Sequence, residues 1–239
     1  MGIYGVGLAV SSKWIAQGHR TLEDIRTKVD LTPNQRIGLE HREDFESRVP
    51  RAEVAEHARI VQDALRKFDS AFQLIVGGSY RRGKSDSGDI DCLITKKGAS
   101  IEHIRTILME SVVPFLFRIG FLKAALATSH NRDDGSKWHG ASALPNSKIW
   151  RRIDLLFVPW DEFGAALIYF TGNDIFNRSI RLLASKKGMR LNQHGLYKDV
   201  MRGRQRDRIT EGTLVEGRSE QKIFEILGVP WRLPEDRNC

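Results

Sequence analysis

Cysteine is scarce in this chain: Cys92 and Cys239 are the two examples in 239 residues. They show no CxxC spacing, which excludes a disulfide framework and a zinc ribbon. The sequence also lacks an apolar run of membrane-spanning length, a start typical of a secretory signal, an internal repeat and a low-complexity tract. We therefore expect a protein of a reducing intracellular compartment, without a membrane partner.

Acidic residues are outnumbered, with 38 Lys and Arg against 30 Asp and Glu and a net charge of +8. Such an excess favours a polyanionic partner, because each phosphate neutralised by a cation releases condensed counterions. Charge alone fits a merely basic protein equally well. Since 41% of the residues are hydrophobic, the chain can bury a core.

Periodicity indicates an α+β fold with a central β-sheet. In the segment Arg51–Phe68, apolar residues recur at alternating four- and three-residue steps, which predicts a helix with one apolar stripe. Short apolar runs bounded by turn residues predict strands. The predicted elements are helices at 51–68, 101–117 and 219–227, strands at 72–77, 90–95 and 153–158, and a hairpin with a polar tip over 121–149.

The most informative stretch is GGSYRRGKSDSGDID, residues 77–91. A strand leads into a glycine-permitted turn, where backbone N–H groups and hydroxyls can meet phosphate oxygens. Arg82 adds a guanidinium suited to bidentate phosphate contact. Asp89 and Asp91 open the next predicted strand, and residues two apart on a strand point to the same face.

A third acid, Asp154, lies within the apolar strand Ile153–Val158. An unpaired carboxylate there is costly, so it needs a metal, a cationic partner such as Arg152, or exposure at the end of the sheet. Mg²⁺ prefers carboxylate oxygens and commonly shares its shell with substrate phosphates. The three acids therefore predict a two-metal phosphoryl-transfer site. Ordinary ion pairs with surface arginines are the alternative interpretation.

The combination of Gly78-Ser79 with Asp89-x-Asp91 is the signature of the nucleotidyltransferase superfamily. The longer string Gly-Ser-Tyr-Arg-Arg-Gly-Lys, followed by Ser87-Gly88-Asp89, resembles the family X DNA polymerases. A second block, YFTGNDIFNRS at 169–179, is similar to the deoxynucleotide-binding region of that family. Gly5-Val6-Gly7 resembles its helix-hairpin-helix, and the ending LGVPWR at 227–232 also fits.

The resemblance implies a fold in three parts. Residues 1–48 would form a fingers subdomain with the helix-hairpin-helix, residues 49–157 the catalytic palm, and residues 158–239 a small α+β thumb that contacts nucleotide and template. The lyase domain that some members carry ahead of this region is absent, so removal of 5′-deoxyribose phosphate is not expected. Gln193 departs from the family, which often has Glu there.

The resemblance also implies a role for individual residues. Asp89, Asp91 and Asp154 would bind two Mg²⁺ ions, which Mn²⁺ can replace, with Arg152 beside Asp154 near the primer end. The implied nucleotide-binding residues are Arg48, Ser79, Arg82, Ser87, Gly88, Tyr169, Phe170, Gly172, Asp174 and Asn177. The implied DNA-binding residues are Gly5, Val6, Gly7, Arg178 and Arg181.

Some of these roles compete with simpler interpretations. The backbone carbonyls of Ile3 and Val6 would hold a monovalent cation, yet a lone GxG is also a generic turn before a helix. For the pair Tyr169-Phe170 the alternative is ordinary core packing. For the implied DNA-binding arginines of residues 178–181 it is a solvated basic helix face.

The resemblance implies a template-directed DNA polymerase that adds deoxynucleotides to a primer 3′-hydroxyl, filling short gaps in base excision repair or end joining. It further implies a nuclear monomer whose partners are gapped or primer-template DNA and deoxynucleoside triphosphates. One alternative is a template-independent terminal nucleotidyltransferase. Such enzymes carry an extended loop between palm strands, whereas the hairpin near His130–Lys137 looks short. A catalytically silent DNA-end-binding scaffold is the second alternative, against which the three acids argue.

Overall fold

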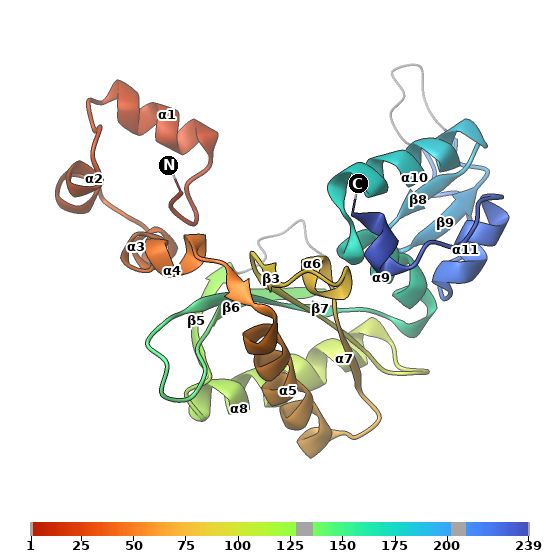
Figure 1. Cartoon of the computed structure of the whole chain (residues 1–239), viewed down its shortest axis with the longest axis horizontal. Coiled ribbons are helices and arrows are strands. Elements are labelled where there is room, and N and C mark those ends of the chain that lie inside the picture. Colours follow the sequence, from red (N-terminus) through yellow and green to blue (C-terminus); the bar gives the residue numbers. More distant parts are fainter. Residues whose placement is uncertain (1, 128–135, 202–208, 239) are drawn as a thin grey trace.

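The computed structural model describes residues 2–127, 136–201 and 209–238. A helical N-terminal part, a central sheet with its helices and a C-terminal part with a small sheet follow one another along the chain. Figure 1 shows the two smaller parts above opposite ends of the central sheet. The predicted α+β class is confirmed. None of the helices in the described residues has both the length and the apolar character that a membrane crossing needs.

The N-terminal part consists of α1 (Leu8–Ala16), α2 (Leu22–Lys28), α3 (Pro33–Glu40) and α4 (Arg42–Glu46). Capping boxes fix the start of α2 and of α3. In each, the threonine hydroxyl accepts from the backbone N–H three residues on, and the threonine backbone N–H donates to the side chain of that same residue. The buried core of this part is small and comprises Ile3, Trp14, Ile25, Leu31 and Leu39.

The central sheet has the strand order β2-β4-β7-β6-β5, and β4 and β7 are its parallel pair. Its strands are β2 (Gln73–Val76), β4 (Ile90–Thr95), β5 (Leu122–Ala127), β6 (Lys137–Ser142) and β7 (Arg151–Phe157). Below the sheet in Figure 1 lie α5 (Arg51–Phe68), α7 (Ile101–Ile107) and α8 (Val113–Arg118).

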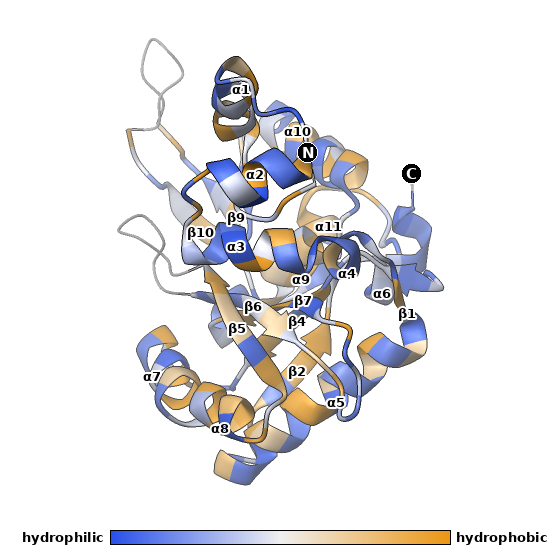
Figure 2. Cartoon of the chain, turned by 90° about the vertical axis from the view of Figure 1, so that its left-hand side faces the viewer, coloured by the Kyte–Doolittle hydropathy of each residue, from blue (hydrophilic) through white to orange (hydrophobic). Residues whose placement is uncertain are grey.

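Alternate residues of the central strands build the core between the sheet and these helices. From β4 and β7, Ile90, Cys92, Ile153 and Leu155 are fully buried there. We call this side the apolar face of the sheet. Figure 2 shows the matching pattern, with hydrophobic residues along the strands and many hydrophilic ones on the outer surface of α5.

Two short elements link the sheet to the N-terminal part. The strand β1 (Val49–Pro50) pairs with β3 (Asp86–Ser87), and α6 (Gly78–Arg81) follows β2 directly.

The C-terminal part contains α9 (Phe163–Thr171), α10 (Asp174–Lys186), α11 (Glu220–Ile226), a small sheet of β8 (Arg190–Asn192), β9 (Gly195–Lys198) and β10 (Thr213–Glu216), and the 3₁₀ turns Trp160–Glu162 and Pro234–Arg237.

The predicted bounds of α5 and β4 are confirmed, and so is the helix predicted over 101–117. This helix contains a π-helical turn at Leu108–Val112, next to Pro114, whose nitrogen cannot donate to the preceding turn. Two other local predictions are wrong. The glycine-serine turn is instead the one-turn helix α6. Asp89 lies just before β4 rather than inside it. The hairpin of β5 and β6 is present, and its tip over 128–135 lies outside the described residues.

Candidate active site

A row of polar side chains crosses the central sheet on the side opposite the apolar face. Asp91 of β4 is the direct neighbour of Asp154 on β7, and Asp154 is the direct neighbour of His139 on β6. Residues in register on neighbouring strands point to the same face. We call Asp91, Asp154 and His139 the polar row. Asp89 immediately precedes β4 at the same end of the sheet.

Electrostatics in the polar row oppose full ionisation of the acids. Burial, followed by the charges of Asp89 and Asp154, raises the pKa of Asp91 to about 8, while Arg152 and His139 act in the opposite direction. Burial also raises the pKa of Asp89, although Arg152 counteracts it. Carboxylates crowded in this way need a cation between them to ionise together.

The carboxylate of Asp89 is held by an arginine. Arg152 Nη2 lies 2.9 Å from Asp89 Oδ2 and 3.5 Å from the carbonyl oxygen of Gly88. Its Nε is buried and has no hydrogen-bond partner among the described residues. Arg152 therefore lies beside the acids, as the resemblance implies, and its side chain keeps an unused donor.

Two glycines allow the turn after β2 to approach the acids. A Cβ atom on Gly77 would come within 2.9 Å of the Leu93 side chain and 3.0 Å of the carbonyl oxygen of Phe170. Gly78 has φ +56°, and a Cβ atom there would lie 3.0 Å from Asp91 Oδ2. Both positions therefore require glycine for a close approach.

Several of the implied triphosphate contacts lie around α6 and β3. The Ser79 hydroxyl is 2.9 Å from the Ser87 hydroxyl and 3.3 Å from the carbonyl oxygen of Asp86. Arg48 donates from Nε to Asp86 Oδ1 at 2.8 Å, and its Nη1 lies 3.2 Å from where a Cβ atom of Gly88 would be. The structure thus brings Arg48, Ser79, Ser87 and Gly88 together.

The implied nucleotide-binding residues of the C-terminal part line a cavity of about 390 Å³. Asn177 donates from Nδ2 to the carbonyl oxygen of Tyr169 at 2.7 Å, which fixes its amide at the cavity wall. Gly172 has φ +68° and the Gly172–Asn173 peptide bond is cis. The cavity is lined by Arg82, Tyr169, Phe170, Thr171, Gly172, Asn173, Asp174, Asn177, Arg178 and Arg181.

Arg82 is tied to the C-terminal part on two sides. Its Nη1 donates to the carbonyl oxygen of Thr171, and its Nε lies 3.1 Å from Asn238 Oδ1. Asn238 Nδ2 in turn donates to the carbonyl oxygen of Arg82 at 3.1 Å. Arg82 therefore lies at the edge of the nucleotide cavity, next to Gly172.

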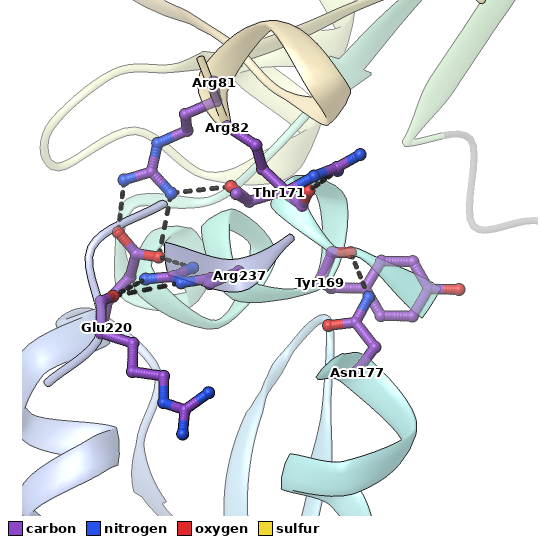
Figure 3. A network of polar contacts seen from close by, with 8 residues as sticks. Arg81, Arg82, Tyr169, Thr171, Asn177, Glu220 and Arg237 are labelled. Carbon is purple, nitrogen blue, oxygen red and sulfur yellow. Dashed lines mark hydrogen bonds and ion pairs between the residues drawn. The ribbon is translucent and has the colours of Figure 1, made fainter. Parts of the chain in front are cut away.

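A buried ion network joins α6 to α11, as Figure 3 shows. Arg81 donates to both carboxylate oxygens of Glu220, at 3.0 and 2.5 Å, and to the Thr171 hydroxyl at 2.7 Å. Fully buried Arg237 donates to Glu220 Oε1 at 2.9 Å and lies over the ring of Trp231. Since losing Glu220 would leave the buried Arg237 and the partly buried Arg81 without their carboxylate, this network holds α6 and the C-terminal part together.

The implied DNA contacts lie on the two outer parts. Gly5 has φ +77°, and Gly7 is the residue that precedes α1. The carbonyl oxygen of Ile3 accepts from the N–H of Val6 at 3.2 Å, so the implied cation ligand already takes part in a turn. On α10, exposed Arg178 pairs with Asp174 at 2.8 Å, and Arg181 lies over the Tyr169 ring at 5.0 Å.

The acids fit a divalent metal by their chemistry, although their side chains do not yet converge. Three carboxylates offer the hard oxygen donors that Mg²⁺ prefers, and burial together with the two neighbouring acids raises the pKa of Asp91. Within the described residues, no group of three or more His, Cys, Asp or Glu side chains is close enough to hold a metal ion.

Sequence reasoning missed four residues at this site. His139 lies 2.8 Å from Asp154, Asn238 holds Arg82, and Arg81 and Glu220 join the palm to the C-terminal part. The alternation of β6 was the available signal for His139, but its register against β7 was not readable. The other three are brought together by contacts across 139 and 156 residues of sequence, for which no local pattern exists.

Comparisons with known proteins agree with this geometry. Family models match for the DNA polymerase beta palm at residues 48–160, the DNA polymerase beta thumb at 166–238 and the fingers domain of DNA polymerase lambda at 1–46. The chain is 39% identical over 238 residues to DNA polymerase lambda of Rattus norvegicus, covering 99% of this chain and 41% of that protein.

Two further relatives cover the same region. DNA polymerase lambda of Arabidopsis thaliana is 35% identical over 243 residues, with 99% of this chain and 45% of that protein covered. DNA nucleotidylexotransferase of Monodelphis domestica is 29% identical over 273 residues, with 99% and 51% covered. The chain therefore spans about half or less of the length of these relatives.

This chain belongs to the family X DNA polymerases. Members of this family are metal-dependent nucleotidyltransferases. The models for the fingers, the palm and the thumb match successive stretches of the chain.

Proposed function

We propose that this chain is a template-directed DNA polymerase that extends a primer in short gaps of duplex DNA. The observation that carries the proposal is the placement of Asp91 and Asp154 as register neighbours, with Asp89 at the same end of the sheet. A family X sequence supports it along the whole chain. The substrates would be deoxynucleoside triphosphates and gapped or primer-template DNA.

In the proposed reaction, the primer 3′-oxygen attacks the α-phosphorus of the incoming nucleotide. The new P–O bond forms as the bond to the β-phosphate oxygen breaks, so pyrophosphate leaves and the hydroxyl proton passes to a base. Two Mg²⁺ ions, replaceable by Mn²⁺, would supply hydroxyl activation and charge neutralisation. Asp89, Asp91 and Asp154 would hold them, and Asp154 would also orient the primer end.

The remaining residues of the site would bind and orient the substrates. Arg48, Ser79, Ser87 and Gly88 would hold the triphosphate from one side, and Arg82 from the other. Arg152 would stay beside the primer terminus. Tyr169, Phe170 and Gly172 would pack against the sugar, Asp174 and Asn177 would flank the base, and Gly5, Val6, Gly7, Arg178 and Arg181 would contact DNA, with a monovalent cation near the carbonyls of Ile3 and Val6.

A specific observation favours a templated reaction over terminal transfer. The match to the DNA nucleotidylexotransferase runs over 273 residues, more than the 239 of this chain, so that relative carries additional residues within the matched region. The match to the rat DNA polymerase lambda runs over 238 residues without such an excess. A role in nuclear DNA repair, as a monomer, belongs to the same proposal.

The test is single-nucleotide incorporation on a duplex with a one-nucleotide gap in Mg²⁺. We expect correct incorporation on this substrate and little on a lone single strand. Asp154→Ala should abolish extension while DNA binding stays within about twofold, and the exposed-acid control Asp63→Ala should match the wild type. Near-normal extension by Asp154→Ala would refute the site, and equal extension of the single strand would favour a terminal transferase.

A further inference from the structure

His139 extends the row of acids by one strand. In the order β4-β7-β6, its Cα is in register with that of Asp154, which is in register with that of Asp91. The neighbouring Trp138 belongs to the core of the apolar face, so the alternation of β6 turns His139 to the opposite face. We call this side, which carries the polar row, the polar face. Asp154 is therefore flanked by a second carboxyl group on one side and by an imidazole on the other.

The imidazole makes a direct contact with the acid. His139 Nδ1 lies 2.8 Å from Asp154 Oδ1, and the two side chains are 31% and 26% exposed. An ionised carboxylate only accepts hydrogen bonds, so Nδ1 carries the proton in this contact. Partial burial limits competition from water, which makes the bond effective as an orienting contact.

Asp154 needs such an orienting contact for a physical reason. The terminal torsion of an aspartate is broad and roughly two-fold, so its carboxylate rotates easily. A bond from His139 to one oxygen restrains this rotation and leaves the other oxygen available. Ligating carboxylates in metal sites are commonly held by outer hydrogen bonds in this way.

We propose that His139 is a positioning residue that holds the Asp154 carboxylate in the orientation needed to bind the divalent ion. The proposal rests on the proposed function of Asp154 as a metal ligand. It assigns to a strand residue outside the nucleotidyltransferase motifs a role in the metal affinity of the site. Loss of an outer-shell partner of this kind typically costs about 10–100-fold in metal affinity or activity.

Two substitutions separate the hydrogen bond from the space that the ring fills. In His139→Asn, the amide nitrogen takes the place of Nδ1, so the donor is kept. In His139→Leu, a side chain of similar width remains and the donor is lost. His103→Leu is the matched control, because His103 lies on α7 and contacts Lys96 instead of the acids.

The first measurement is Mn²⁺ binding by electron paramagnetic resonance, without DNA or nucleotide. We expect Asp154→Ala to abolish Mn²⁺ binding and His139→Leu to lower the Mn²⁺ affinity about tenfold. The affinity of His139→Asn should stay within about threefold of the wild type. His103→Leu should bind as the wild type does. Thermal unfolding of each variant shows whether the fold is retained.

The second measurement is the Mg²⁺ dependence of incorporation on the gapped duplex. In His139→Leu, the Mg²⁺ concentration for half-maximal rate should rise about tenfold and kcat should fall, while the KM for nucleotide changes less than twofold. Wild-type Mn²⁺ affinity and Mg²⁺ dependence in His139→Leu would overturn the proposal, and so would a loss that His139→Asn shares in full. If Asp154→Ala itself binds Mn²⁺ normally, the proposed metal site has failed, and the proposal falls with it.

Discussion

On the apolar face of the central sheet, Ile153 and Leu155 are completely buried against the helices. On the other face, Asp154 stands between them in sequence but next to Asp91 and His139 in space. One strand therefore supplies stability on one side and chemistry on the other. The polar face is electrostatically unfavourable without a cation, so the apolar face has to hold the strands in register for it.

The largest expected effect comes from a substitution that changes the polar face alone. Asp154→Asn keeps the shape of the side chain and removes its charge. Incorporation should fall by about 10³-fold or more, the order expected when a ligand of the catalytic metal is lost. The melting temperature of the metal-free protein should stay the same or rise, because a crowded charge disappears. Steady-state kinetics and thermal unfolding check this, and a lower melting temperature would contradict the contrast between the faces.

The next largest effect is expected from a substitution that changes the apolar face alone. Leu155→Ala removes a fully buried side chain adjacent to Asp154 and should cost about 2–5 kcal/mol of unfolding free energy. Denaturant unfolding measures this cost. The control Leu182→Ala, at a 57% exposed site, should change stability by less than about 0.5 kcal/mol. At low temperature the folded Leu155→Ala fraction should keep its KM for nucleotide, and a large change there would show that the faces are not independent.

A third prediction concerns pH and sharpens the electrostatic side of the comparison. The folded pKa of Asp91, at about 8, exceeds its ordinary value of 3.8, so the folded state binds more protons than the unfolded state between those values. The stability of the metal-free protein should therefore fall as pH rises from about 4 to 8. Asp91→Asn should remove this fall and raise the melting temperature at pH 8 by several degrees.

Added Mg²⁺ and a lower pH distinguish the contribution of Asp91 to this pH dependence from that of His57. Saturating Mg²⁺ should restore the stability of the wild type at pH 8 and leave Asp91→Asn nearly unchanged, because binding to the folded state stabilises it. The opposite sign arises at His57, whose pKa burial lowers to about 4, so stability is lost as pH falls from 6.5 towards 4. A melting temperature that rises steadily from pH 6.5 to 8 without metal would contradict the raised pKa of Asp91.

Much of this contrast was predictable because strands have a period of two. Asp89, Asp91 and Asp154 lie in or beside apolar strands, so their shared face followed from alternation once the two strands were placed together. The partner of Asp154 on its other side was not predictable. A one-residue shift of β6 would turn His139 to the apolar face, and the β5–β6 pair contains irregularities that sequence does not reveal.

The partners of Arg81 and Arg82 could likewise not be predicted from a local sequence pattern. Arg81 and Arg82 are adjacent in sequence, and both guanidinium groups turn to the C-terminal part, one to Glu220 and the other to Thr171 and Asn238. A resemblance to the family assigns Arg82 to the triphosphate without saying what holds it. Which of two neighbouring arginines enters a buried network depends on residues more than 130 positions away.

The smallest expected effect lies near the C-terminal end of the described residues, at Asn238. Asn238 accepts from Arg82 Nε and donates to the Arg82 carbonyl oxygen, so it fixes the direction of the guanidinium. Asn238→Ala should raise the KM for nucleotide about two- to fivefold with kcat nearly unchanged, because the lost bond to the Arg82 guanidinium is exposed and such a bond contributes about 0.5–1 kcal/mol. Asn238→Asp keeps the accepting oxygen and should stay close to the wild type. If Asn238→Ala lowers kcat and leaves KM unchanged, the C-terminal residues act on the acids rather than on Arg82, and the polar face would be a single coupled unit.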